Sequence, residues 1–377
     1  MTDAATSERT SLLPAAWIFF TLLIVLALAP LRLLSQTAPG SATSPSTVPL
    51  RIASFNTELS RKGPGLLLRD IERGEDAQIE AVIALIAEIK PDILALQSID
   101  WDYENRALKA LERRLSLAGH AFPHLFARQP NSGLATALDL DGDQRLGGPG
   151  DSQGFGNYTG RSGIAVLSRL PIQHQSVTDL SSLLWRDLPG ATLPRHPDGS
   201  PFPSVEAQAI QRLSATAHWA LPVSLPDGRE LVLLTFQATP PLFDGPEQRN
   251  LLRNRDEIHL WQRFLDQALP APFDTPPTRR FVLAGGANLD PDTGAGDHQA
   301  IINLLNHPKL QDPRPQSAQA GLNTVHWPKA GQMRVDYLLP SQDLIVLDAG
   351  VLWPETPGSP AAKASRHRLI WVDLLVE

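Results

Sequence analysis

The stretch FVLAGGANLDP, residues 281–291, begins as a run of apolar side chains and ends in two glycines, an alanine and an asparagine. A short apolar run that is closed by glycine and proline is typical of a buried strand. The segment therefore predicts a strand inside a sheet core, followed by a tight loop that carries Asn288 and Asp290. Gly286, at the end of this strand, has no side chain to contribute to a site there.

Other strands and helices are predicted on both sides of this segment. Apolar runs predict strands at PLRIASFNTEL (49–59), PDILALQSI (91–99), GIAVLSRLPI (163–172), ELVLLTFQAT (230–239), RVDYLLPS (334–341) and RLIWVDLLV (368–376). Helical spacing of apolar residues predicts helices within 76–90, 101–119 and 246–269. Interspersed strands and helices indicate an α/β protein with one mixed sheet, or a pair of sheets, covered by helices.

The composition is that of an ordinary globular domain, with 42% hydrophobic residues and a formal net charge of -7 over 377 residues. Residues 50–377 are expected to form one domain, and we expect a monomer. The absence of cysteine excludes disulfides, cysteine zinc sites and thiol nucleophiles. An acidic chain has no long-range attraction for nucleic acid, so a nucleic-acid partner stays open without support from the net charge.

The N-terminus differs in composition from the rest of the chain. Residues 11–31 are uncharged and mostly apolar, between Arg9 and Arg32. About 20 apolar residues cross a bilayer, whereas the core of a signal peptide has roughly 7 to 15. We therefore predict a tail (1–10), a transmembrane anchor or signal segment (11–34) and a flexible linker (35–49); a buried core helix is a third alternative. The domain would then lie outside the cytoplasm, in the periplasm or extracellular space, held at the membrane or secreted after cleavage.

Five segments, in this order along the chain, resemble the motifs of the endonuclease/exonuclease/phosphatase superfamily, the deoxyribonuclease-like phosphoesterases. They are SFNTE (54–58), PDILALQSID (91–100), GRSGIAVLSRLPI (160–172), VLAGGANLDP (282–291), and VDYLLPS (335–341) together with SRHRLIWVDL (365–374). The resemblance implies an α/β fold with a two-sheet β-sandwich flanked by helices. It also implies a divalent-metal-dependent phosphoesterase that uses Mg²⁺ or Mn²⁺ on a phosphodiester or phosphomonoester.

The resemblance extends to some site positions and fails at others. The family's catalytic positions are matched by Asn56, Asn288, Asp336 and His367. Other residues replace four expected groups: the metal-binding Glu is Ser98, a His is Gln237, and two Asp are Gly286 and Arg366. Phosphoester cleavage needs carboxylates for the cation and a base for water. Two alternatives follow, a weakened or remodelled hydrolase and an inactive module that binds an anion.

Three acidic residues are candidates for replacing the lost metal ligands. Side chains alternate along a strand, so Glu58 shares a face with Asn56, and Asp100 with Ser98. Asp290 follows Asn288 in the loop. The alternatives are a solvated strand end for Glu58, a helix cap for Asp100 and a turn for Asp290.

Two further clusters carry predicted binding sites. In DLDGDQRLGGPGD (139–151), Asp139, Asp141 and Asp143 stand at every second position, which is typical of a calcium loop or of a solvated acidic turn. In the helix within 246–269, Arg and Asn recur at four-residue spacing and favour an anion, unless they form a solvated face. The predicted substrate-binding set is Arg161, Arg249, Asn250, Arg253 and Gln237, with Arg366 close by.

Overall fold

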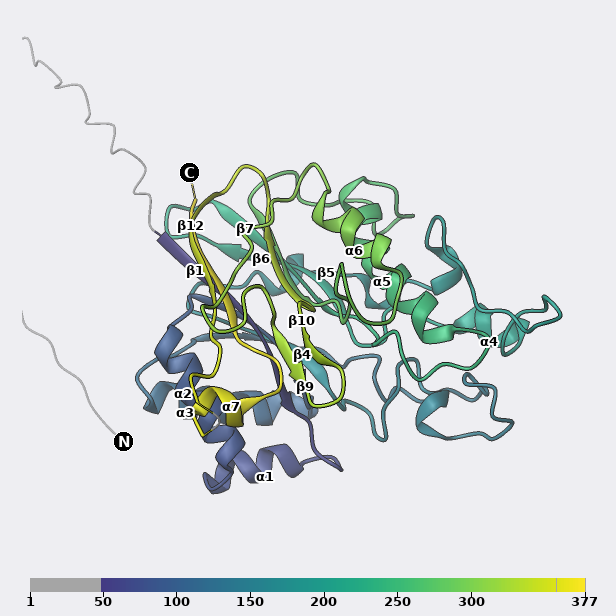
Figure 1. The fold of residues 1–377 in the computed structure, drawn as a ribbon, viewed down its shortest axis with the longest axis horizontal. Coiled ribbons are helices and arrows are strands. Elements are labelled where there is room, and N and C mark those ends of the chain that lie inside the picture. Colours follow the sequence, from purple (N-terminus) through teal and green to yellow (C-terminus); the bar gives the residue numbers. More distant parts are fainter. Residues whose placement is uncertain (1–48, 357, 377) are drawn as a thin grey trace, which may run out of the picture. The chain divides into compact units, whose positions relative to one another are not determined.

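The computed structural model describes residues 49–356 and 358–376 (Figure 1). The predicted tail, the anchor or signal segment and nearly all of the linker lie outside these residues. Within the described part of the chain, no helix is both long and apolar enough to span a bilayer.

Two sheets form the centre of the domain. The first has six strands in the order β12 (Ile345–Val351), β13 (Ile370–Leu375), β1 (Pro49–Leu59), β2 (Ile93–Ile99), β4 (Gly163–Ser168) and β3 (His124–Phe126). The second has five, in the order β11 (Asp336–Pro340), β8 (Phe281–Gly286), β7 (Glu230–Gln237), β6 (His218–Ser224) and β5 (Thr178–Asp179). A separate two-stranded hairpin joins β9 (Val325–Trp327) to β10 (Gly331–Met333).

The two sheets pack face to face. Ile52 and Ile93 of the first sheet lie in one core cluster with Leu233 and Val282 of the second, and all four are buried. Because successive side chains of a strand point to opposite faces, their neighbours along each strand face outward. Each sheet therefore has a second apolar face that a further layer must cover.

Helices cover both outer faces. The first sheet packs against α1 (Leu66–Arg73), α2 (Ala77–Ile89), α3 (Arg106–Leu117) and α7 (Pro360–Ala364), and the second against α5 (Arg249–Leu265) and α6 (His298–Leu305). A short helix, α4 (Val205–Ile210), lies in a long connection. Figure 1 shows α1, α2, α3 and α7 gathered on one side of the sheets and α5 and α6 on the other. Asp76 is the N-cap residue of α2, and its carboxylate accepts from the backbone N–H groups of Gln78 and Ile79.

The α/β two-sheet fold implied by the sequence is confirmed. The seven predicted strand segments correspond to β1, β2, β4, β7, β8, β11 and β13, and the predicted helices to α2, α3 and α5. The sequence reading missed β6, which contains Pro222, and α1, which has only eight residues. A proline within β6 argues against a strand in the sequence, and α1 is too short for its helical spacing to stand out from one sequence window.

The strand ends define where a site can form. Strands β1 and β2 are parallel, and so are β7 and β8, so each pair brings its carboxyl ends to one edge of its sheet. At the end of β8, Gly286 pairs with Gln237 on one side and with Asp336 on the other. The residues that follow these strands therefore lie close together.

Candidate active site

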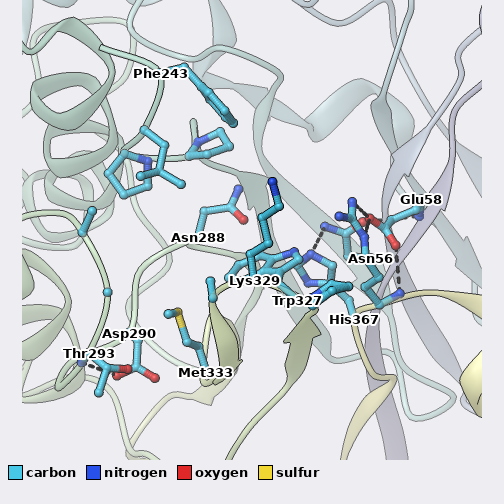
Figure 2. Close-up of a pocket in the computed structure, with 18 of the residues that line it drawn as sticks. Asn56, Glu58, Phe243, Asn288, Asp290, Thr293, Trp327, Lys329, Met333 and His367 are labelled. Atoms are coloured by element: carbon cyan, nitrogen blue, oxygen red, sulfur yellow. Dashed lines mark hydrogen bonds and ion pairs between the residues drawn. The ribbon is translucent and has the colours of Figure 1, made fainter. Parts of the chain in front are cut away.

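A cavity of about 730 Å³, here the main cavity, lies at these strand ends. Asn56, Ser98, Gln237, Asn288 and His367 are among the residues that line it. Figure 2 shows Asn56, Asn288 and His367 at this cavity. Residues from β1, β2, β7, the loop after β8 and the segment before β13 thus meet at one place. The chain brings together three of the four polar groups that the resemblance implied, and the fourth, Asp336, contacts His367 from behind.

His367 and Asp336 form a buried pair. Their Nδ1 and Oδ2 atoms are 2.8 Å apart, and the Thr324 hydroxyl donates to the same Asp336 oxygen at 3.0 Å. With Nδ1–H directed at the carboxylate, Nε2 faces the cavity, where the Asn56 amide nitrogen lies 3.5 Å away. A carboxylate that orients an imidazole in this way is the arrangement of a general base.

The second oxygen of Asp336 has no partner. Oδ1 is buried and makes no hydrogen bond within the described residues. A Cβ atom at Gly286 would lie 3.3 Å from it. The resemblance places a carboxylate at position 286, so the glycine there removes an acidic group next to Asp336 Oδ1.

Ser98 and Gln237 satisfy each other. The Ser98 backbone N–H donates to Gln237 Oε1 at 3.1 Å, and Gln237 Nε2 donates to Ser98 Oγ at 2.8 Å. By the resemblance these positions hold a metal-binding Glu and a His. Two neutral groups that bond each other now replace an acid and a base.

Glu58 lines the main cavity but is held by Arg366. Its carboxylate accepts from Arg366 Nε and from the Arg366 backbone N–H, each at 2.8 Å, and from Ser365 Oγ at 3.0 Å. Burial by itself raises the pKa of Glu58, but the hydrogen bonds from Arg366 outweigh it and lower that pKa below its usual value. The prediction that Glu58 replaces a lost metal ligand does not fit this pairing.

Asp100 stabilises loops instead of facing Asp336. Its carboxylate accepts from the Ser60 and Tyr158 hydroxyls at 2.8 and 2.6 Å, and from the backbone N–H groups of Arg61 and Ser162 at 2.7 and 3.0 Å. Four donors saturate it, and it is absent from the wall of the main cavity. The prediction of a replacement ligand is therefore wrong for Asp100.

Asp290 is a turn residue, which is the alternative that the sequence also predicted for it. Its Oδ1 accepts from the backbone N–H groups of Asp292 and Thr293 at 2.8 and 2.9 Å, and its Oδ2 from that of Arg334 at 2.6 Å. Figure 2 shows it beside Thr293, well away from Glu58 and His367. Asp290 lines the main cavity without adding a free oxygen near Asp336.

The residues of the main cavity do not fit a divalent cation. Mg²⁺ and Mn²⁺ need several oxygen ligands, and Asp336 Oδ1 is the one unpaired carboxylate oxygen among the buried side chains of the described residues. Among these residues, the group of acidic or His side chains close enough to share an ion is Asp139, Asp141 and Asp143, whose ligand atoms lie within 4.8 Å of one another. The predicted acidic triad is thus assembled, away from the main cavity.

Within the triad of Asp139, Asp141 and Asp143, burial raises the pKa of the Asp141 carboxyl, and so do the nearby charges of Asp143 and Asp151.

The Arg and Asn residues of α5 do not form an exposed stripe. Arg253 is 1% exposed and donates to the backbone carbonyls of Leu213, Gln153 and Arg212. Arg249 is also buried and donates to the carbonyl of Leu140. The helix uses these side chains to hold surrounding loops. Arg161, Arg249, Asn250, Arg253 and Gln237 nevertheless meet around a second cavity of about 200 Å³, here the arginine cavity.

Sequence reasoning missed the apolar wall of the main cavity. Trp327 of the β9–β10 hairpin packs edge-on against His367, with ring centroids 5.6 Å apart. Phe243 is 89% exposed and lies with Leu242 in the loop between β7 and α5, and both line the cavity. The available signal was the segment TPPLFDGP (239–246), in which prolines present two large apolar residues.

Two packed sheets with polar side chains gathered at their strand ends define a deoxyribonuclease-like α/β protein. The family model described as "Endonuclease/Exonuclease/phosphatase family" matches residues 53–367, and the chain belongs to this family. Members of the family include phosphoesterases and are commonly dependent on divalent metals. The family assignment made from the motifs is confirmed.

Solved structures agree with the fold. An endonuclease/exonuclease/phosphatase from Beutenbergia cavernae DSM 12333 aligns with a TM-score of 0.52 and 15% identity, over 87% of this chain and 72% of that chain. A family protein from Leptotrichia buccalis C-1013-b aligns with the same score and identity, over 87% of this chain and 100% of that chain. No curated protein matches the chain. At this identity the likeness establishes the fold alone.

Proposed function

We propose that the main cavity binds a phosphate-containing or similar anionic ligand, and that the chain does not hydrolyse phosphoesters by the metal-dependent route of its family. The Ser98–Gln237 pair is the observation that carries the proposal. Ser98 and Gln237 occupy the positions where the family motifs have a metal-binding Glu and a His. Their side chains are bonded to each other at 2.8 Å, and Gln237 also accepts from the Ser98 backbone N–H at 3.1 Å. Gly286 has no carboxylate where the family motif has one, and the Glu58 carboxylate is bonded to Arg366 and so is not free to bind a cation.

The cavity offers donors for an anion. Figure 2 shows the Lys329 side chain extending between Asn288 and Asn56, and Lys329 has no ion-pair partner among the described residues. Asn288 uses one amide hydrogen on the Ala238 carbonyl at 2.7 Å, which leaves the second for a ligand. A cation and neutral amides favour a negatively charged group here.

The apolar wall adds a second property to the ligand. Phe243, Leu242 and Trp327 line the same cavity as Lys329. Exposed aromatic and aliphatic side chains at a cavity rim favour contact with an apolar body. The ligand class that matches both parts is a phosphate ester with an apolar chain or ring.

A second candidate function is slow phosphoester hydrolysis. The observation that favours it is the His367–Asp336 pair, which keeps the geometry of a general base beside Asn56. Removing one member of a catalytic group typically costs orders of magnitude in rate. Any turnover by this pair would therefore be far below that of a complete site.

Two finer predictions stay predictions. A calcium ion at Asp139, Asp141 and Asp143 would stabilise the 128–162 loop, and the assembled triad supports it. The location of the domain outside the cytoplasm, with residues 11–34 as anchor or signal, concerns residues that the structure does not describe.

Hydrolysis and binding can be tested on the same purified full-length protein. Turnover of bis(p-nitrophenyl) phosphate and p-nitrophenyl phosphate is measured with Mg²⁺, with Mn²⁺ and with chelator. We expect no metal-dependent turnover, together with calorimetric binding of decyl phosphate but not of decanol, weakened in Lys329→Gln.

Each other outcome has a defined meaning. Metal-dependent turnover that disappears in Asp336→Ala would overturn the proposal and show a working metal site. Metal-independent turnover that disappears in His367→Gln would select the second candidate. Equal affinity for decyl phosphate in the natural protein and in Lys329→Gln would refute the assigned anion position.

A further inference from the structure

The arginine cavity lies next to the main cavity, and Gln237 and Pro240 line both. It is small, about 200 Å³, which exceeds the roughly 30 Å³ that one water occupies in the liquid. Three arginines, Arg161, Arg249 and Arg253, reach its wall from two different parts of the chain. The cavity therefore has room for a group of several heavy atoms surrounded by guanidinium donors.

Two buried polar groups at this wall have no partner. Arg249 is 7% exposed, and while its Nη1 donates to a carbonyl, its Nε has no acceptor among the described residues. Ser132 is 3% exposed, and its hydroxyl likewise has no partner there. More than nine in ten buried polar groups are hydrogen-bonded. Both atoms are enclosed by protein, and they belong to residues that line the cavity, so a group bound there can supply the missing acceptor once these side chains turn toward it.

The charge at this wall is not neutralised by close contacts. Arg253 gives its Nε and Nη2 to backbone carbonyls and not to carboxylates. The guanidinium of Arg161 faces the Phe155 ring, 6.0 Å from its centroid, and has no carboxylate within ion-pair distance among the described residues. Burial lowers the pKa of Arg253 to about 10, which still leaves it charged at neutral pH.

The nearest buried acid does not remove this charge. Glu257 is fully buried, and its carboxylate accepts from the backbone N–H groups of Ala215 and Thr239, each at 2.6 Å. Burial raises the pKa of Glu257 to about 7, so it is only partly ionised at neutral pH. Asp141, Asp151, Asp244 and Glu247 lie near enough to Arg249 to act on its charge, but none of them forms an ion pair with it among the described residues. A buried guanidinium group without an ion pair is costly unless a counter-ion binds.

We infer that the arginine cavity is an oxyanion site, which binds a phosphate or sulfate group through Arg161, Arg249 and the Ser132 hydroxyl. Planar guanidinium groups and a hydroxyl are the donors that match a tetrahedral oxyanion. The site is distinct from the one assigned to Lys329, and it does not depend on whether the main cavity binds or hydrolyses a ligand. Because the two cavities adjoin, a ligand with two anionic groups is able to occupy both.

Calorimetric titration of the full-length protein with inorganic phosphate, and separately with sulfate, tests this site. The variants are Arg161→Gln and Ser132→Ala. Arg279→Gln is the charge-matched control, because Arg279 is largely exposed and lies outside both cavities. Lys329→Gln distinguishes the main cavity from the arginine cavity.

We expect Arg161→Gln and Ser132→Ala each to weaken phosphate or sulfate binding by roughly tenfold or more, the usual effect of losing a charge-assisted hydrogen bond. Arg279→Gln should leave this binding unchanged, and Lys329→Gln should weaken only the part of the anion binding that belongs to the main cavity. Ser132→Ala removes an unpaired buried hydroxyl, so its thermal midpoint should not fall, which separates lost binding from lost folding. Binding unaffected by the first two variants, binding lost only in Lys329→Gln, or no binding of either anion at millimolar concentration would each overturn the inference.

Discussion

Gln237 and Ser98 are held together by two hydrogen bonds, one to the Ser98 backbone and one to its side chain, across two different sheets. Ser98 has a positive φ of 54°, a conformation that few residues other than glycine adopt without support. The pair therefore stabilises the end of β2 as well as filling the site.

The first prediction concerns the stability that this pair provides. Gln237→Ala leaves the Ser98 N–H without its acceptor, so we expect a loss of about 1–3 kcal/mol in the free energy of unfolding. Ser98→Ala removes only the hydroxyl and should cost less. In a double-mutant cycle measured by denaturant unfolding, the two changes should be coupled by about 0.5–1.5 kcal/mol. Strict additivity would show that the two side chains do not interact in solution.

The second prediction concerns Gly286→Asp. The new carboxylate starts from a Cβ 3.3 Å from Asp336 Oδ1, so two negative charges would face each other in a buried place. We expect the variant to be destabilised in chelator and to be stabilised by Mg²⁺ or Mn²⁺, since a cation that binds only the folded state raises its stability.

Gly286→Asn is the matched control for this change, because it has the same shape without the charge. Thermal unfolding with and without Mn²⁺ provides the measurement. Only the Asp variant should respond to the metal. An equal response in the natural protein would mean that Asp336 already holds a cation with the ligands present.

The third prediction concerns pH. His218 is fully buried, with its Nδ1 2.7 Å from Ser214 Oγ, and burial together with the charge of Arg253 lowers its pKa to about 3. In the unfolded chain a His takes up its proton near pH 6.5. Stability from neutral His218 is therefore complete above about pH 6.5 and is lost as pH falls toward 3, by at most about 1.4 kcal/mol per pH unit.

His218→Gln should be less stable than the natural protein at pH 8 but should lose less stability on acidification. Denaturant unfolding at a series of pH values between about 8 and 4 measures both slopes. His326→Gln, at an exposed His, is the control and should keep the natural slope. If the slope of His218→Gln equals the natural one, His218 does not titrate between the folded and unfolded states.

The sequence predicted what depends on short segments. Strands β1, β8 and β13 follow from apolar runs of a few residues, and motifs in or beside those runs predicted Asn56, Asn288 and His367. The structure puts all three around one cavity, as the resemblance implied. Local pattern and motif were enough because each strand positions the residues next to its own ends.

What the sequence did not predict depends on contacts between distant segments. The Glu58 carboxylate accepts a hydrogen bond from Arg366, 308 positions away, and the Asp100 carboxylate accepts one from Tyr158. Neither carboxylate is therefore free to replace a metal ligand. The spacing of Arg249 and Arg253 on α5 was read correctly as one helix face, but loops far along the chain cover that face. Partner choice of this kind depends on tertiary packing, which no single window of sequence contains.

The last prediction concerns the apolar wall of the main cavity. Phe243 is 89% exposed, so Phe243→Ser should leave the free energy of unfolding within about 0.5 kcal/mol of the natural value. The same change should weaken binding of decyl phosphate, because an apolar chain gains about 0.8 kcal/mol per buried methylene group and Phe243 lines the cavity. Binding of inorganic phosphate should not change, since it has no apolar part.

Tyr103→Ser is the control, at a residue that is 78% exposed and lies outside the main cavity. Calorimetric titration of both variants with decyl phosphate and butyl phosphate separates the effect of chain length. A loss in Phe243→Ser that is larger for the longer chain supports an amphiphilic ligand, whereas equal binding by the natural protein and both variants would show that the exposed ring serves no ligand with an apolar chain.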